Sequence, residues 1–248
     1  MTLVTTLSVS GDFAVMTTDT RKVNKTYYKD LKTGEYEAVE GSPLKVSQEK
    51  SYKVEFLSAF VMMGTGGTSE LALYIKKKLR TRVNYTDDLK ACGEKLKAVI
   101  DEIRLDEHAP VFCWFLDQTD GVYVLLNGFY EDGSNGLVVY GASPGAKVEE
   151  VPAPLSHSQW AMIPPVNMYT EVFKPKLQEG TLNEAVNLLL GFHGQIAYLQ
   201  KVEVSSDCHY FIIKKGEGGV LTTHQGVFDT SIWHKEYDKN VSDVECGL

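Results

Sequence analysis

A β-hairpin is predicted at the start of the chain by residues 1–23, which read MTLVTTLSVS GDFAVMTTDT RKV. Two runs of β-forming residues, 2–10 and 13–20, flank a tight turn at Gly11-Asp12. Chain ends usually fray, so a strand that begins at the second residue needs a reason. The residue there is Thr2, and a threonine hydroxyl becomes a nucleophile when a base removes its proton.

Composition indicates a globular protein and disfavours a nucleic-acid partner. The chain has 248 residues, of which 43% are hydrophobic and 23% charged. Its formal net charge is −8, whereas phosphate binding requires clustered Lys and Arg. The basic run at residues 76–82 falls at the end of a predicted helix, where cations complement the helix dipole.

Cysteine and histidine spacing gives no sign of a metal site or a cofactor. The four cysteines are far apart, and the six histidines are scattered without metal-ligand spacing. No apolar stretch approaches the roughly 18 residues that span a bilayer, and no signal peptide precedes the first strand. We therefore expect a cytoplasmic protein with reduced thiols and no membrane segment.

The first half of the chain predicts strands followed by two helices. Residues 21–51 are polar and read as an irregular insertion with a small hairpin turning at Thr33-Gly34. Strands are expected at 52–57 and 60–64, and the glycine cluster at 64–67 ends that sheet. A helix capped by Thr68 follows, and Thr86-Asp87-Asp88 opens a second one.

The second half returns to strands, with one more helix. Strands are predicted at 111–116, 122–130 and 137–140, followed by a proline-rich crossing between residues 152 and 165. A helix starts at the capping box Thr181-Leu182-Asn183-Glu184, and a hairpin around 216–219 closes the chain. This order predicts one α+β domain over 1–248, a four-layer αββα sandwich of two antiparallel sheets with helices outside.

These features resemble the N-terminal-nucleophile (Ntn) hydrolases, in particular the proteasome β-subunit and the bacterial proteasome-like peptidases. The resemblance is carried by Thr2, by Asp19 with Arg21, by YKVEFLSAFVMMGTGG at 52–67, and by the helix after it. The stretch LNEAVNLLLGFHGQIAYLQKVEVSSDCHYFII at 182–213 also resembles the family's later helix and closing hairpin. The resemblance implies the sandwich fold, a peptide or protein substrate, and a homo-oligomer.

The resemblance also assigns catalytic roles. Thr2 is the nucleophile, and its own α-amine, free once Met1 is removed, titrates near ~7.7–8 and acts as the base. Lys53 holds positive charge beside the hydroxyl, and Asp19 keeps Lys53 charged and in position. The Gly66 amide donates to the oxyanion, and Ser205 is the surviving member of an Asp-x-x-Ser motif that supports the amine.

Several alternatives stay open at the sequence level. Thr5 and Thr6 are competing nucleophiles, and Lys45-Val46 is a second Lys-Val pair beside Lys53-Val54. The interval from Thr2 to Asp19 is one position longer than the family's, so the turn is expected to absorb one residue as a bulge. Residues 163–166, Ile-Pro-Pro-Val, stand where the family has Gly-Ser-Gly.

The leading functional hypothesis is a threonine-type peptidase or amidase that works through an acyl-threonine intermediate. Because the groups that orient the amine are partly missing, a non-catalytic scaffold or binding subunit on the same fold is the alternative. A third hypothesis is a transpeptidase or protein ligase, in which an amine rather than water resolves the acyl-threonine.

Overall fold

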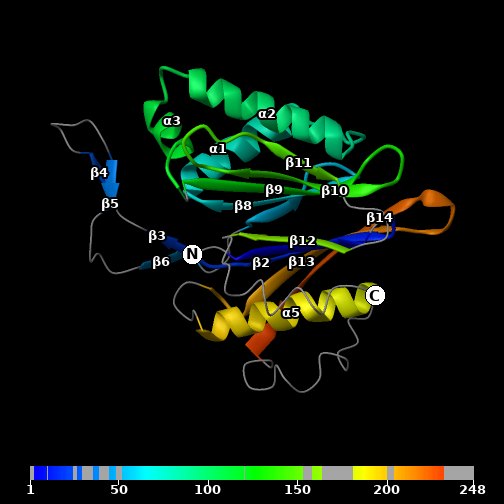
Figure 1. Cartoon of the computed structure of the whole chain (residues 1–248). Coiled ribbons are helices and arrows are strands. Elements are labelled where there is room, and N and C mark those ends of the chain that lie inside the picture. The colour runs from blue at the N-terminus through cyan, green and yellow to red at the C-terminus, as the bar shows by residue number, and fades with distance from the viewer. Residues whose placement is uncertain are drawn as a thin grey trace.

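A computed structural model was analysed, and it is shown in Figure 1. It describes residues 3–9, 11–24, 27–29, 36–38, 45–48, 52–119, 121–152, 158–163, 181–199 and 204–231.

The first sheet contains the N-terminal hairpin at its centre. Its five strands are all antiparallel, in the order β12-β1-β2-β13-β14. They are β1 (Val4–Val9), β2 (Phe13–Asp19), β12 (Ser158–Ile163), β13 (Asp207–Lys215) and β14 (Leu221–Asp229). Strand β12 was not predicted, because it lies within the stretch interpreted as a proline-rich crossing.

The two strands of the N-terminal hairpin, β1 and β2, pair regularly. The register is unbroken from Val4–Thr18 to Val9–Phe13, so no bulge interrupts the two strands. Gly11 adopts a φ of +74°, a conformation that glycine reaches without steric cost. The paired strands themselves contain no bulge, and the absorption of an additional residue at the turn stays a prediction.

The second sheet is also antiparallel, with strand order β11-β10-β9-β8-β7. The strands are β7 (Val54–Phe56), β8 (Val61–Gly67), β9 (Val122–Phe129), β10 (Asn135–Gly141) and β11 (Glu149–Pro152). The sequence predicted that this strand ends at Gly64. In the structure the glycine cluster at 64–67 belongs to β8, which ends at Gly67.

The insertion at 21–51 is more regular than predicted. Strand β3 (Lys22–Asn24) pairs with β6 (Lys45–Gln48), and β4 (Tyr27–Lys29) pairs with β5 (Tyr36–Ala38). Both pairs are antiparallel, and the second encloses the expected turn. The turn residues Thr33 and Gly34 themselves lie outside the described residues.

Four α-helices occur in the described part of the chain: α1 (Ser69–Arg80), α2 (Leu89–Leu105), α3 (Pro110–Leu116) and α5 (Leu182–Leu199). A short 3₁₀ turn, η2 (Glu217–Gly219), joins β13 to β14. The capping box before α5 is confirmed, because the Thr181 N–H donates to Glu184 and the Glu184 N–H donates to Thr181 Oγ1. Thr68 occupies the N-cap of α1, but its side chain makes no capping hydrogen bond.

Helix α3 replaces a strand that was predicted at 111–116. Val111, Phe112 and Trp114 have high β-propensity, which motivated the prediction. Pro110, however, is the first helical residue, where its fixed φ and missing N–H fit a helix start. The helix buries Phe115 and Leu116 against α1, α2 and β9, so tertiary packing overrides local propensity.

Three hydrophobic clusters define how the elements pack. Helices α1 and α2 cover the outer face of the second sheet, α5 covers the outer face of the first, and the two sheets face each other (Figure 1). The inter-sheet cluster joins Val4 and Met16 of the first sheet to Met62, Leu125 and other residues of the second. The predicted α+β class with two antiparallel sheets is confirmed.

Two buried asparagines tie the sheets together. The side-chain amide of Asn127, on β9, donates to Thr6 Oγ1 on β1. The amide of Asn135, on β10, donates to the carbonyl oxygens of Val9 (2.8 Å) and Phe13 (3.1 Å) at the hairpin end. None of the helices in the described residues is long and apolar enough to cross a membrane.

Candidate active site

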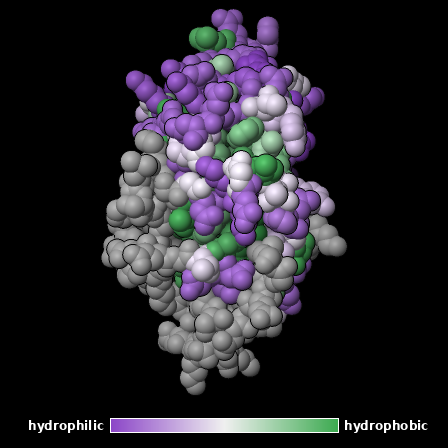
Figure 2. Space-filling model, turned by 90° about the vertical axis from the view of Figure 1, so that its right-hand side faces the viewer, coloured by the Kyte–Doolittle hydropathy of each residue, from purple (hydrophilic) through white to green (hydrophobic). Residues whose placement is uncertain are grey.

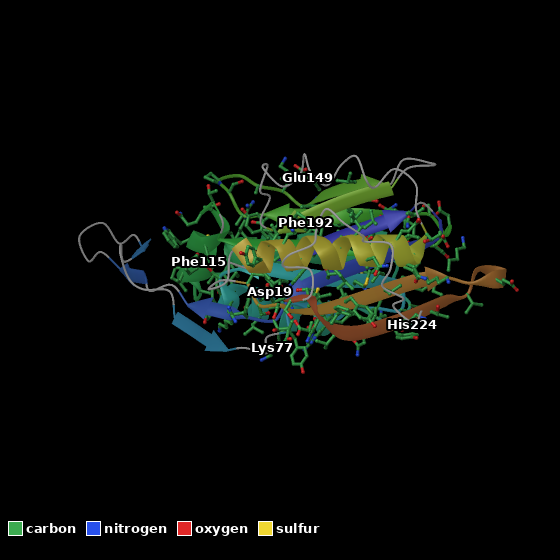
Figure 3. All side chains as sticks on the ribbon, turned by 90° about the horizontal axis from the view of Figure 1, so that it is seen from below. Asp19, Lys77, Phe115, Glu149, Phe192 and His224 are labelled. Atoms are coloured by element: carbon green, nitrogen blue, oxygen red, sulfur yellow. The ribbon has the colours of Figure 1, made fainter. Side chains whose placement is uncertain are left out.

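Asp19, the last residue of β2, is the centre of the candidate site. Its side chain is fully buried, and each carboxylate oxygen accepts backbone or side-chain donors. Oδ1 accepts from the Leu3 N–H (2.8 Å) and from Lys53 Nζ (2.6 Å), and Oδ2 accepts from the Arg21 N–H (3.0 Å). Figure 3 shows Asp19 beside α5, at the end of its strand. A carboxylate with three donors is held in a single orientation.

Lys53 comes from the other sheet, directly before β7. Its residue exposure is 7%, and its ammonium forms a buried ion pair with Asp19. Burial lowers the pKa of Lys53, the charge of Asp19 opposes that shift, and the charge of Arg21 adds to it. The contact resolves the choice between the two Lys-Val pairs, because Lys45 lies in β6 of a separate small sheet.

The backbone around Lys53 is fixed by its neighbours. The Lys53 carbonyl accepts from the N–H of Thr65 on β8 (3.0 Å), and Lys76 Nζ donates to the carbonyl of Tyr52 (2.9 Å). Lys76 is 4% exposed, and burial lowers its pKa to about 8. The sequence analysis placed Lys76 among the cations at a helix end that complement the dipole; the structure also buries it, with its ammonium on the carbonyl of Tyr52, the residue before Lys53.

Ser205 joins the site through Thr20 and not through Asp19. Its Oγ accepts from the Thr20 N–H (3.0 Å), lies 3.0 Å from Thr20 Oγ1, and donates to the Asp207 carbonyl (3.1 Å). Its carbonyl accepts from Nε2 of His193 on α5 (2.9 Å). The hydroxyl of Ser205 thus connects, by hydrogen bonds, the residue after β2 with the first residue of β13.

His193 is a residue that sequence reasoning missed. It is completely buried, and its Nδ1 has no hydrogen-bond partner among the described residues. Burial lowers the pKa of His193, while the charge of Asp19 opposes that shift, so the ring carries its proton on Nε2 and stays neutral. In the sequence, His193 is one residue of an apolar helix face and nothing distinguishes it from a packing residue.

The geometry of β8 separates the two glycines that could supply an oxyanion donor. Gly66 pairs with Tyr123 on β9, and the preceding Thr65 N–H points the other way, to Lys53. Amides of successive strand residues face alternate sides, so Gly66 directs its N–H toward β9 and Gly67 toward the Lys53 side. Gly67 also has a φ of +87°, which favours glycine.

The three candidate nucleophiles differ in what the structure says of them. Thr2 lies outside the described residues, but the peptide bond that joins it to Leu3 supplies the N–H bound by Asp19. Thr5 and Thr6 lie inside β1 and are completely buried. The Thr5 hydroxyl is 2.6 Å from that of Thr17, and the Thr6 hydroxyl donates to a carbonyl of β2.

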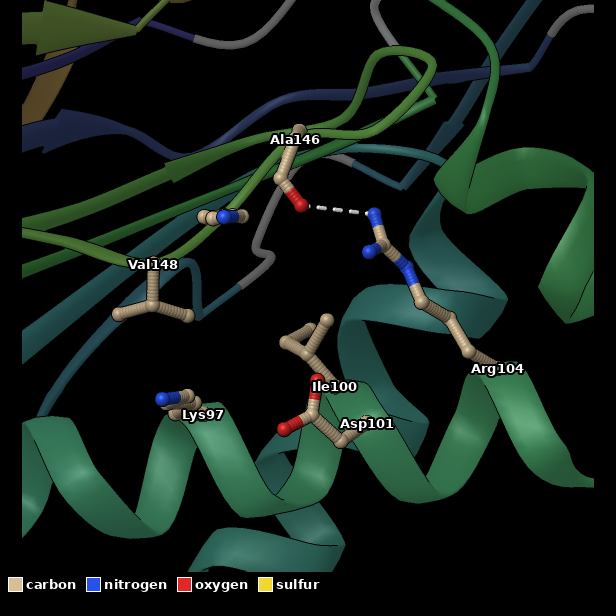
Figure 4. Close-up of a pocket in the computed structure, with 7 residues that line it drawn as sticks. Lys97, Ile100, Asp101, Arg104, Ala146 and Val148 are labelled. Atoms are coloured by element: carbon tan, nitrogen blue, oxygen red, sulfur yellow. Dashed lines mark hydrogen bonds between the residues drawn. The ribbon is translucent and has the colours of Figure 1, made fainter.

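A separate pocket lies away from the ion pair. A cavity of about 190 Å³ lies between α2 and the loop after β10, bordered by Ile100, Arg104 and Val148 (Figure 4). Arg104 donates to the Ala146 carbonyl (2.8 Å), so its guanidinium is already partly engaged. Within the described part of the chain, no three His, Cys, Asp or Glu side chains converge as metal ligands do.

Comparison with models of known protein families gives no match, and no curated protein is significantly similar to this chain. The function is therefore inferred from the geometry of the site itself.

Proposed function

We propose that this chain is a threonine-type peptidase or amidase with the four-layer αββα arrangement of the Ntn hydrolases. The packing of α1 and α2 on one sheet and of α5 on the other supports the fold assignment. We further propose that the enzyme works in the cytoplasm, where its free thiols Cys92, Cys113 and Cys208 would stay reduced.

One observation carries the proposal. A buried Lys53–Asp19 ion pair bridges the two sheets, and the same Asp19 oxygen binds the N–H one peptide bond from Thr2. Burying two charges is costly, and such pairs often contribute little to stability. A costly ion pair at the head of the first strand, one residue from a threonine, supports a role in activating that hydroxyl.

In the proposed reaction, removal of Met1 frees the α-amine of Thr2, which takes the hydroxyl proton as Oγ attacks the substrate carbonyl. The Lys53 ammonium stabilises the developing negative charge on the hydroxyl oxygen. The proton then passes from the amine to the leaving amine, and an acyl-threonine ester forms. Water attacks the ester by the same route in reverse and releases the acid.

The oxyanion donor in this scheme is the Gly67 amide in place of the Gly66 amide. The alternation along β8 supports this choice, since of the two glycine amides it is that of Gly67 that faces the side of Lys53. One such donor is typically worth roughly 2.7–4 kcal/mol in the transition state.

Intact-mass spectrometry with a β-lactone or vinyl sulfone probe tests the proposal. Protein that lacks Met1 should gain one probe mass, and peptide mapping should place the probe on Thr2. Thr2→Ser keeps a hydroxyl and should still be labelled, whereas Thr2→Ala should not. Absence of label on protein shown to begin at Thr2 would remove the peptidase assignment.

The engagement of Ser205 favours the second candidate, a non-catalytic scaffold or binding subunit. Its hydroxyl is committed to Thr20 and to the Asp207 carbonyl, so it has little capacity left to orient an amine. Retention of Met1 in protein from the native host would support the scaffold. Ligation, the third hypothesis, would give more aminolysis than hydrolysis product when an amine acceptor is supplied.

A further inference from the structure

Strand β14 forms one edge of the first sheet. It pairs with β13 over all nine residues, from Asp207–Asp229 to Lys215–Leu221, without a shift in register. Among the described strands it has no neighbour on its outer side. Figure 3 shows it at the rim of the molecule, where His224 is labelled.

The hydrogen-bonding side of each β14 residue follows from the hairpin end. The Gly216 N–H donates to the Val220 carbonyl, so even-numbered residues of β14 bond to β13. Odd-numbered residues therefore turn their N–H and C=O groups outward, Thr223, Gln225 and Val227 among them. Such a row of backbone groups is a template for another strand.

Proteins usually protect an edge of this kind with charge, proline or a bulge. The edge strand β11 of the second sheet has Glu149, Glu150 and Pro152. By contrast, β14 reads LTTHQGVFD, has Asp229 at its end as its one acidic residue, contains no Lys, Arg or Pro, and is regular throughout. Its Val227 side chain is 60% exposed. Figure 2 shows small hydrophobic patches among hydrophilic residues in the middle of this face of the molecule.

The strand is complementary to itself. An antiparallel pairing of two copies centred on Gln225 brings each outward-facing residue opposite another outward-facing one. Gln225 then lies beside Gln225 of the partner subunit, and Thr223 lies beside Val227 of the partner subunit. Asp229 falls opposite Leu221 of the partner subunit, so no two like charges meet.

We propose that the chain forms a two-fold symmetric dimer in which the β14 strands of two copies pair, joining their five-stranded sheets into one continuous sheet. The interface is isologous, because the same strand is used by both copies. It is independent of the proposed peptidase chemistry, since none of its residues belongs to the candidate site.

Sedimentation velocity of the full chain tests the dimer. The mass should be twice the 27.6 kDa of one chain at roughly 100 µM, where even a micromolar Kd saturates binding. Gln225→Pro should return the protein to the single-chain mass. The proline removes an N–H that faces the partner, and it leaves the hydrogen bonds between β14 and β13 intact. Gln225→Lys, which places like charges at the two-fold axis, is a second variant in case proline disturbs the strand.

A pair of cysteine variants tests the register. Gln225→Cys should form an inter-chain disulfide on mild oxidation, because a directly opposite pair has Cα atoms about 5.5 Å apart. Thr222→Cys should not form one. In this register Thr222 of the partner subunit lies six residues away along the paired strand, at a distance of about 20 Å. Wild type controls for the native thiols. A single-chain mass at every concentration, or a dimer that Gln225→Pro and Gln225→Lys leave intact, would overturn the proposal.

Discussion

Replacing Asp19 by asparagine should destabilise the protein strongly. The change preserves size and leaves an oxygen for the Leu3 N–H, but it removes the charge that compensates Lys53, which is only 7% exposed. Breaking a buried pair in this way typically costs about 3–5 kcal/mol, because the remaining charge stays buried without a partner. Set against a total stability of about 5–15 kcal/mol, this is a large loss.

Urea unfolding at pH 7, followed by circular dichroism, measures the effect as a lower midpoint at an unchanged m-value. Lys53→Met in the Asp19→Asn background removes the orphaned charge and should restore part of the lost stability. Glu102→Gln, in the partly exposed pairs with Lys78 and Arg82, is the control and should change the free energy of unfolding much less. If Asp19→Asn cost no more than Glu102→Gln, the pair would not be the buried, compensated contact described above.

The remaining predictions concern two buried bases and one glycine. The pKa of Lys76 is about 8 in the folded protein and 10.5 in the unfolded chain, so folding favours the neutral amine. Between pH 8 and 10.5 the wild type should therefore gain roughly 3 kcal/mol of stability relative to Lys76→Met, because the penalty for burying the charge disappears as Lys76 loses its proton. A flat difference between the two unfolding series would contradict this. The lowered pKa of His193 means that folding favours its neutral form, so stability should fall as the pH drops below about 6.5, by up to about 1.4 kcal/mol per unit. His193→Gln should reduce that slope in acid titrations, and an unchanged slope would count against it. Gly128→Ala should lower stability by roughly 1–3 kcal/mol, since a Cβ there would lie 2.1 Å from the Phe60 carbonyl oxygen; a melting temperature equal to wild type would be inconsistent with that clash.

Local patterns predicted most elements whose packing agrees with their propensity. The N-terminal hairpin, the helices α1, α2 and α5, and the closing hairpin follow from periodicity, capping residues and turn glycines. Two elements were missed for opposite reasons. Helix α3 has a β-forming composition that its packing overrides, and β12 is stabilised by its pairing with β1, which no local pattern reveals.

The candidate site was predictable only where a resemblance pointed to it. The contact between Asp19 and Lys53 was expected and is present, whereas their catalytic roles stay predictions. His193 and Lys76 were not found from the sequence. There His193 looks like any residue of a helix face, and Lys76 is one of three consecutive lysines, whereas both are buried in the structure. His193 is buried within the electrostatic reach of Asp19 and Lys53, and Lys76 is buried against the backbone of Tyr52; both positions depend on three-dimensional packing.

The two inter-sheet asparagines have a consequence for the distant ion pair. Apolar faces alone would let one sheet slide over the other at little energetic cost, since hydrophobic contact has no direction. The side-chain amide of Asn135 donates to two carbonyls at the hairpin end of the first sheet. These hydrogen bonds fix the position of one sheet relative to the other at the end of β2 opposite Asp19. Small errors in that alignment would travel along the rigid strands and open the gap between carboxylate and ammonium. Asn135 therefore helps to set the distance between Asp19 and Lys53, although it lies at the other end of the strand.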